Sequence, residues 1–164
     1  MTTPLSENKE KLPSDLVLAC RRLYAAIDKL DQAAASLAGV SRNDLSCLNL
    51  LEYGAASPSQ IARQLGLTSG SVTMLVDRLE RGGLVRRMPD PNDRRGVLVE
   101  PLPRLFEILG PVYAKVAQEI ERVAQSYDRD EVAAAIQHLD DATFAYKTAS
   151  VNAQSMKSSC RTME

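Results

Sequence analysis

The chain has 164 residues, 45% of them hydrophobic and 25% charged, with a formal net charge of −1 at neutral pH. This profile is typical of a soluble globular protein, and no apolar stretch approaches the roughly 20 residues that span a bilayer. One histidine, three widely spaced cysteines and the lack of a glycine-rich phosphate motif leave no pattern for an enzyme, a metal site or a cofactor. Residues 1–11 lack the apolar core of a signal peptide, so we expect a cytoplasmic protein.

The N-terminal part of the chain predicts a long helix. Residues 1–12 are polar and predict a disordered arm. Apolar residues then recur at alternating spacings of four and three, at Leu16, Cys20, Leu23, Ile27, Leu30, Ala34 and Leu37. A helix over residues 14–37 would be about 36 Å long. That length favours packing on a second subunit, and the alternative is a long core helix within one chain.

Residues 41–83 predict three shorter helices. Ser41 with Asp44, and Ser57 with Gln60, have the spacing of a capping box. In this motif two side chains and two backbone amides at the start of a helix hydrogen-bond reciprocally. Both pairs therefore predict a helix that begins at the following residue.

A tight turn joins the second of these helices to the third. Gly66 ends one and Thr68 caps the other, which is expected over residues 69–81. Two short helices joined in this way are typical of a helix-turn-helix. Residues 84–88 and 97–100 then alternate as strands around a loop of turn-forming residues, which predicts a β-hairpin. A hairpin after a helix-turn-helix indicates a winged helix.

Proline marks the start of the C-terminal region. Pro101 and Pro103 break the second strand, and apolar residues then repeat at helical spacing. Pro111 predicts a kink or a restart within the first of these helices. Residues 150–164 are polar and predict a flexible tail.

Charge is distributed unevenly along the chain. Residues 57–100 carry seven basic and five acidic side chains, whereas residues 1–56 have a net charge of −1 and residues 101–164 a net charge of −2. All seven bases of the middle block are arginines. Arginine makes forked contacts with phosphates and base edges that lysine cannot make. The placement of these arginines favours a nucleic-acid partner.

Three segments of the middle block resemble the MarR family of winged-helix transcriptional regulators. They are S-P-S-Q-I-A-R-Q-L-G-L at 57–67, T-S-G-S-V-T-M-L-V-D-R-L-E-R-G-G-L-V-R-R at 68–87 and D-P-N-D-R-R-G-V-L-V at 90–99. The order of elements fits the family across roughly residues 14–147. Family members commonly continue into L-T-x-x-G, whereas this chain has L-P-R-L-F at 102–106, without the glycine.

The resemblance implies a mainly α fold with a small β-hairpin wing, in an obligate homodimer held by interleaved terminal helices. It also implies binding to a palindromic operator, usually as a repressor released by a ligand or an oxidant. The expected organisation is a disordered arm at 1–12, a helical dimerisation region at 13–40 and 101–149, a winged helix-turn-helix DNA-binding domain at 41–100, and a flexible tail at 150–164.

The helix over residues 69–81 is expected to enter the major groove, where its N-terminal residues reach base edges. The candidate contacts are Ser69, Gly70, Ser71, Thr73 and Met74. Arg78 lies one turn further along and contacts a phosphate or a base, or pairs with a neighbouring acid. Ser57 and Thr68 are helix caps with a second role as phosphate contacts. The alternative for this face is an ordinary exposed helix surface.

The resemblance also assigns roles in the wing, where Asp93 orients Arg95 and Arg95 enters the minor groove. A narrow minor groove concentrates negative potential and attracts a guanidinium. A carboxylate that fixes the guanidinium beforehand lowers the ordering cost of binding. Arg94 is an expected phosphate contact, and Arg86 or Arg87 is another, because the two face opposite sides of a strand. The alternative is a solvated charged turn.

Outside the middle block, Cys20 lies on the apolar stripe of the first helix. Some family members sense peroxides through a cysteine on this helix, and C-x-x-L-Y at 20–24 is loosely similar. The alternative is an ordinary buried cysteine. Arg21 and Arg22 are candidates for contacting an anionic effector, against the alternative of solvated surface.

The sequence therefore predicts a dimeric, sequence-specific DNA-binding transcriptional regulator, a repressor without catalytic activity. Its expected partners are a double-stranded palindromic DNA operator, a second copy of the chain and a small-molecule effector, with no membrane partner. One alternative is a redox-sensing regulator that acts through Cys20. Another is a winged-helix module that binds proteins and not DNA, which a weak dependence of binding on salt would indicate.

Overall fold

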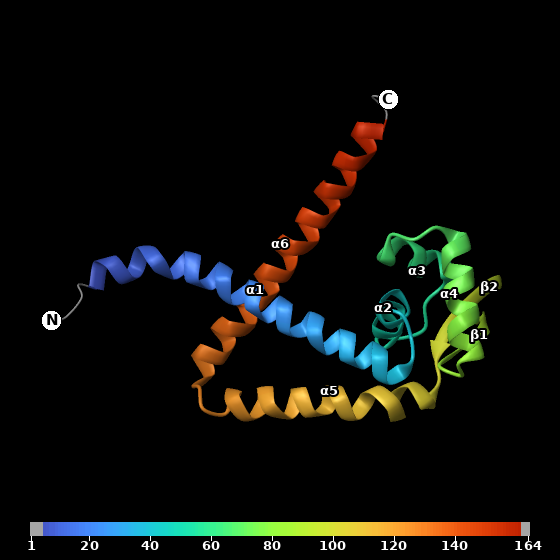
Figure 1. The fold of residues 1–164 in the computed structure, drawn as a ribbon, viewed down its shortest axis with the longest axis horizontal. Coiled ribbons are helices and arrows are strands. Elements are labelled where there is room, and N and C mark those ends of the chain that lie inside the picture. Colours follow the sequence, from blue (N-terminus) through green and yellow to red (C-terminus); the bar gives the residue numbers. More distant parts are fainter. Residues whose placement is uncertain (1–4, 162–164) are drawn as a thin grey trace. The chain divides into compact units, whose positions relative to one another are not determined.

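The structure is a computed structural model that describes residues 5–161 and the side chains of residues 12–153. Its elements, in chain order, are α1 (Leu5–Ala38), α2 (Arg42–Leu51), α3 (Pro58–Leu65), α4 (Ser69–Arg81), β1 (Val85–Asp90), β2 (Asp93–Pro101), α5 (Pro103–Ala124) and α6 (Arg129–Arg161) (Figure 1). They form two compact units, Met1–Val116 and Ala117–Glu164. The mainly α fold with a β-hairpin, predicted from the sequence, is confirmed.

The core of the first unit lies between α2, α3, α4 and the base of the hairpin. The largest of its fully buried side chains are aliphatic: Leu45, Leu48, Leu51, Ile61, Val72, Leu75, Val76, Leu79, Val85 and Val99. Those of α2 and α4 recur three or four positions apart, which places them on one face of each helix. Ala34 and Ala35 at the end of α1 and Leu105 and Leu109 of α5 belong to the same core.

The helix starts follow the predicted caps. Ser41 and Asp44 form one complete capping box, and Ser57 and Gln60 form the other. Thr68 caps α4 by accepting a hydrogen bond from the backbone amide of Ser71 at 3.2 Å. Because each cap satisfies amides that have no partner within the helix, local sequence determines where these three helices begin.

The hairpin is longer than the sequence suggested. The expected loop at 89–96 is wrong, since β1 continues to Asp90 and β2 starts at Asp93. The Asp90 carboxylate accepts a hydrogen bond from the amide of Asn92 at 2.8 Å, and the Asp93 carboxylate accepts one from the amide of Arg95 at 2.9 Å. These contacts close the turn over fewer residues than a loop of Pro, Asp and Asn would suggest.

The long helices also differ from the sequence expectation. Helix α1 begins at Leu5, so residues 5–12, expected to be a disordered arm, belong to it. Pro13 lies inside the helix, where it has no amide to donate to the preceding turn. Residues 1–4 of the expected arm lie outside the described residues.

At the other end, α6 runs to Arg161, so most of the tail expected at 150–164 is helical, and residues 162–164 lie outside the described residues. Neither Gly nor Pro interrupts α6. Helix α5 continues through Pro111, where a kink or a restart was expected. Within the described residues, none of these helices combines the length and apolarity that crossing a membrane requires.

Gly96 provides a test of the packing inside the wing. A Cβ atom at Gly96 would lie 2.8 Å from the Cβ atom of Asp90 and 3.2 Å from that of Asp93. We expect Gly96→Ala to destabilise the hairpin by about 1–2 kcal/mol, because these atoms belong to the turn itself and cannot rotate away. Faster hydrogen exchange of the hairpin amides measures this effect.

Gly70→Ala is the matched control, since a Cβ atom at Gly70 meets nothing within 4 Å. In a helix the added methyl group is neutral or stabilising, by up to about 1 kcal/mol. Equal exchange rates in the two variants would contradict the constraint at Gly96.

Candidate nucleic-acid interface

Helix α4 has one buried and one exposed face. Val72, Leu75, Val76 and Leu79 are buried. The five candidate base contacts are all exposed, and they are Ser69, Gly70, Ser71, Thr73 and Met74. The structure thus brings together on one surface the side chains that the sequence singled out.

The exposed face of α4 has a small, hydroxyl-rich beginning and an apolar centre. The Thr68 and Ser71 hydroxyls are 2.9 Å apart, and the Thr73 hydroxyl donates to the backbone oxygen of Ser69 at 3.1 Å. Met74 is 66% exposed, although it is a large apolar residue. Such a surface allows close approach to base edges and offers an apolar contact for a thymine methyl group.

Arg78 binds an acid of the same unit. Its Nη2 donates to Asp44 Oδ1 at 2.7 Å, and its Nε donates to Asp44 Oδ2 at 3.3 Å. The Asp44 side chain is 4% exposed and that of Arg78 is 46% exposed. The structure shows Arg78 in an ion pair that joins α4 to α2, and its expected contact with DNA stays a prediction.

The environment of Asp44 stabilises its charged form. Burial by itself would raise the pKa of this carboxyl, but hydrogen bonds from Arg78 and Ser41 outweigh it and hold the pKa below its ordinary value. Asp44 therefore both caps α2 and anchors α4.

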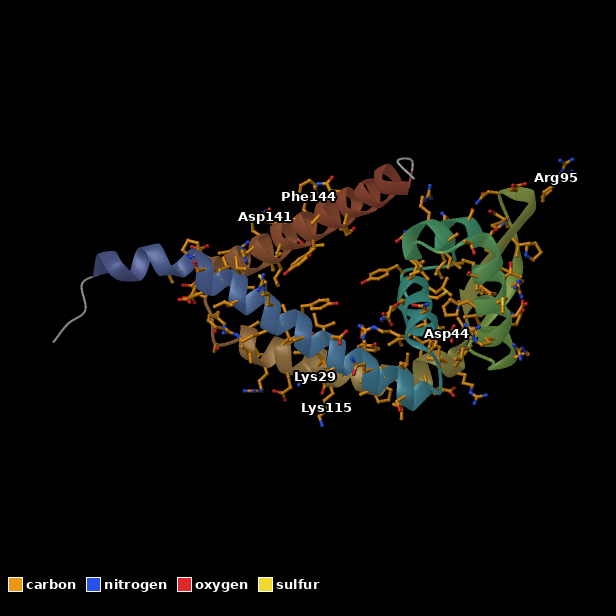
Figure 2. All side chains as sticks on the ribbon, turned by 45° about the horizontal axis from the view of Figure 1, so that its top comes forward. Lys29, Asp44, Arg95, Lys115, Asp141 and Phe144 are labelled. Atoms are coloured by element: carbon orange, nitrogen blue, oxygen red, sulfur yellow. The ribbon has the colours of Figure 1, made fainter. Side chains whose placement is uncertain are left out.

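The wing ends in two exposed arginines, Arg94 and Arg95. Arg95 projects from the tip of the hairpin, away from the helices of its unit (Figure 2). The Asp93 carboxylate accepts a hydrogen bond from the backbone amide of Arg95 at 2.9 Å. Among the described residues no ion pair joins these two side chains, and the role of Asp93 in orienting the guanidinium stays a prediction.

The two arginines of β1 bind acids on opposite sides of the strand. Arg86 pairs with Glu100, which faces it across the hairpin. Arg87 pairs with Asp77 and Glu80 of α4. Burial by itself would lower the pKa of the Arg87 guanidinium, but the hydrogen bonds to the two acids outweigh it and raise that pKa.

Comparison with known proteins agrees with this geometry. The MarR family model matches residues 40–97. An uncharacterized HTH-type transcriptional regulator of Bacillus subtilis (strain 168), YcgE, is 32% identical over 126 residues, which are 76% of this chain and 82% of the relative. The chain belongs to the MarR family. It is a winged-helix, DNA-binding transcriptional regulator, and its relatives are regulators and not enzymes.

Solved structures show the same fold. A MarR family protein from Bacillus stearothermophilus superposes with a TM-score of 0.63 at 22% identity, covering 84% of this chain and 97% of the other. NadR in complex with 4-hydroxyphenylacetate superposes with a TM-score of 0.56 at 19% identity, covering 76% and 89%.

The remaining candidate residues of this MarR-family chain lie at two helix caps and on α1. Ser57 and Thr68 cap α3 and α4, so their hydroxyls already accept backbone hydrogen bonds. Cys20 is half-buried on α1, and Arg21 and Arg22 are exposed there. Their predicted roles stay predictions.

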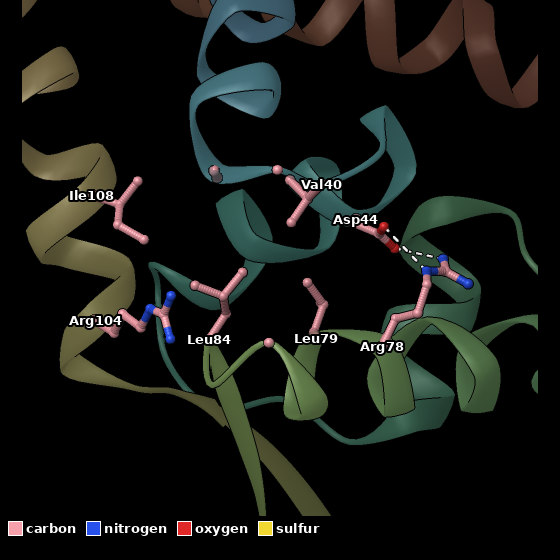
Figure 3. Close-up of a pocket in the computed structure, with 10 residues that line it drawn as sticks. Val40, Asp44, Arg78, Leu79, Leu84, Arg104 and Ile108 are labelled. Atoms are coloured by element: carbon pink, nitrogen blue, oxygen red, sulfur yellow. Dashed lines mark hydrogen bonds and ion pairs between the residues drawn. The ribbon is translucent and has the colours of Figure 1, made fainter.

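A pocket of about 230 Å³ lies beside the recognition helix, within the first unit. Its polar groups are the Asp44–Arg78 pair at one side and Arg104 at the other (Figure 3). The apolar lining residues are Ala38, Val40, Leu79, Leu84 and Ile108. Asp44 and Arg104 were not predicted as site residues from the sequence. Asp44 was visible only as a cap, because its partner is 34 positions away.

The ion pair of Asp44 gives a prediction that depends on pH. Asp44→Asn keeps the cap but removes the charge, and we expect the free energy of unfolding at about pH 7 to fall by about 1–3 kcal/mol. Because the folded-state pKa is lowered, the carboxylate contributes stability above the unfolded pKa of about 3.9 and loses it as the pH falls through the folded value. Urea unfolding at about pH 7 and about pH 3 should show a difference that shrinks in acid.

Asp140→Asn, which changes an exposed acid of α6, is the control and should cost less than about 0.5 kcal/mol at either pH. A gap between wild type and Asp44→Asn that is as large in acid as at neutral pH would contradict the ion-pair assignment.

Proposed function

We propose that the chain represses transcription as a homodimer that binds a palindromic operator, with helix α4 in the major groove and the wing in the minor groove. The observation that carries this is the placement of the exposed face of α4 and the arginines of the wing tip on one unit. A helix fits the major groove, and an arginine is attracted by the negative potential of a narrow minor groove.

In this arrangement α4 and the wing make different contacts with the DNA. Ser69, Gly70, Ser71 and Thr73 approach base edges, and Met74 contacts the methyl group of a thymine. Arg94 binds a phosphate and contributes affinity without sequence information. Arg95 contributes specificity through the width of the minor groove.

Exposed apolar side chains on the long helices support a dimer. On α1, Leu16, Leu23 and Ile27 are each more than 40% exposed. On α6, Phe144 is 73% exposed and Ile136 56%. Apolar stripes of this length on a soluble regulator bury themselves against a second copy. A dimer also presents two recognition helices, which matches the two halves of a palindrome.

We further propose that the pocket beside α4 binds a small organic anion. Arg104 supplies positive charge, the Asp44–Arg78 pair is neutral as a whole, and an apolar lining surrounds them. The volume is below the roughly 300 Å³ at which drug-sized sites begin, so the ligand is small. NadR, which has the same fold, is solved with 4-hydroxyphenylacetate, an anion of this kind.

The test of operator binding uses Arg95→Ala. The DNA is a duplex that the wild-type protein selects from a random-sequence library, and fluorescence anisotropy gives the affinity at several salt concentrations. We expect the variant to bind this duplex more weakly by about 1–3 kcal/mol and to discriminate less against unrelated DNA. The stoichiometry should be two chains per duplex.

Lys115→Ala is the matched control, because it removes one positive charge from an exposed site on α5. It should leave the affinity for the selected duplex nearly unchanged. Equal binding by wild type and Arg95→Ala would overturn the role of the wing tip, and failure of the wild type to select any duplex would overturn operator binding.

The test of the pocket uses small aromatic carboxylates, 4-hydroxyphenylacetate among them. We expect at least one to weaken binding of the wild type to the selected duplex, and Arg104→Gln to respond to it much less, because the variant lacks the charge that holds the anion. Calorimetric titration of the DNA-free protein measures ligand binding directly. An equal response by wild type and Arg104→Gln would show that the ligand binds elsewhere.

A further inference from the structure

The wing is held to the rest of its unit close to its base. It is a two-stranded sheet, and such a hairpin is only marginally stable by itself. Val99 exchanges two backbone hydrogen bonds with Ala56, at 2.9 and 3.0 Å, and the amide of Leu102 donates to Leu84. Arg95 lies at the other end. A small change in the angle of the hairpin therefore moves the tip further than the base.

Arg87 of strand β1 is hydrogen-bonded to two acids of α4. The backbone amide of Arg87 donates to Glu80 Oε1 at 3.0 Å, and its Nη1 donates to the other oxygen of the same carboxylate. Its Nη2 donates to Asp77 Oδ1 at 2.6 Å. Asp77 and Glu80 are three positions apart and lie side by side on α4. Three donors of one residue thus join the wing to α4.

We propose that Arg87 is a positioning residue, which holds the wing at a fixed angle to the recognition helix and does not contact a phosphate. The proposal rests on the operator binding proposed above, since the angle matters because α4 and the wing tip must reach two grooves at once. The Arg87 side chain is 31% exposed, against 63% for Arg86. A planar guanidinium that already bridges two carboxylates cannot turn to a phosphate without breaking both pairs.

Removing either acid tests the proposal, because the two explanations predict opposite changes in the affinity for DNA. Asp77 and Glu80 are exposed on the helix that would face the DNA, where each negative charge repels phosphates. If their only effect were this repulsion, removing one would tighten binding. If they hold Arg87 in place, removing one weakens binding, because the wing loses its angle.

The experiment measures binding of the selected duplex at several salt concentrations by Glu80→Gln, Asp77→Asn and Arg87→Met. We expect each to bind about three- to tenfold more weakly than wild type, with an unchanged dependence of the logarithm of affinity on the logarithm of salt concentration. Arg87→Lys should lose less, because it keeps the charge. Thermal unfolding checks that each variant is folded.

Two matched controls isolate the contact. Glu107→Gln removes an exposed acid from α5 and should change the affinity less than twofold, on the order of a surface charge effect. Arg86→Met removes the neighbouring arginine, whose partner Glu100 is on the hairpin itself, and should weaken binding less than Arg87→Met. Equal or tighter binding by Glu80→Gln, or a salt slope reduced by about 0.9 in Arg87→Met, would overturn the proposal, because the latter is the mark of one phosphate contact.

A measurement without DNA separates this proposal from operator binding. Hydrogen exchange of the DNA-free protein should show faster exchange of the Arg87 amide and of the hairpin in Glu80→Gln than in wild type or Glu107→Gln. Unchanged exchange in Glu80→Gln would overturn the positioning role even if no duplex were selected. Faster exchange together with no selected duplex would keep the contact between wing and helix and reject only operator binding.

Discussion

The orientation of α4 depends on the burial of one of its faces. Val72, Leu75, Val76 and Leu79 are at most 2% exposed. Each such side chain contributes roughly 1.5–3 kcal/mol when it leaves water, which is more than a half-exposed ion pair contributes. Rotating the helix about its axis would expose these residues and bury serine and threonine hydroxyls. The core therefore determines which residues of α4 face outward, and the ion pairs of α4 have a smaller effect on its orientation.

The arginines of the middle block serve two different purposes. Arg78 and Arg87 bind acids of their own unit. Arg78 of α4 binds an acid of α2, and Arg87 of β1 binds acids of α4. Arg94 and Arg95 extend from the wing tip into solvent. Because paired arginines neutralise neighbouring acids, they add little to the field that attracts DNA. At the tip Arg94 and Arg95 stand beside the carboxylates of Asp90 and Asp93, which bind backbone amides of the turn, so the guanidiniums stay exposed there without an ion pair among the described residues.

Local signals in the sequence were sufficient for the helix starts and for the buried faces, because caps and apolar spacing act within one or two turns. They were insufficient where a partner is distant. The pairing of Arg78 with Asp44 joins residues 34 positions apart, and nothing near either residue indicates it. The extent of the hairpin was misjudged for a different reason. Asp90 and Asp93 look like loop residues, yet their carboxylates bind backbone amides and tighten the turn.

Helix α4 contributes both to the pocket and to the proposed DNA-binding face, and this has a thermodynamic consequence. Arg78 and Leu79 line the pocket, while Met74 and Thr73, one turn earlier, lie on the exposed face of the same helix. A ligand that moves Arg78 changes the contact that anchors α4 to Asp44, so it acts on the element that carries the proposed base contacts. Linkage then requires reciprocity. Any factor by which the ligand lowers the affinity for DNA is also the factor by which bound DNA lowers the affinity for the ligand.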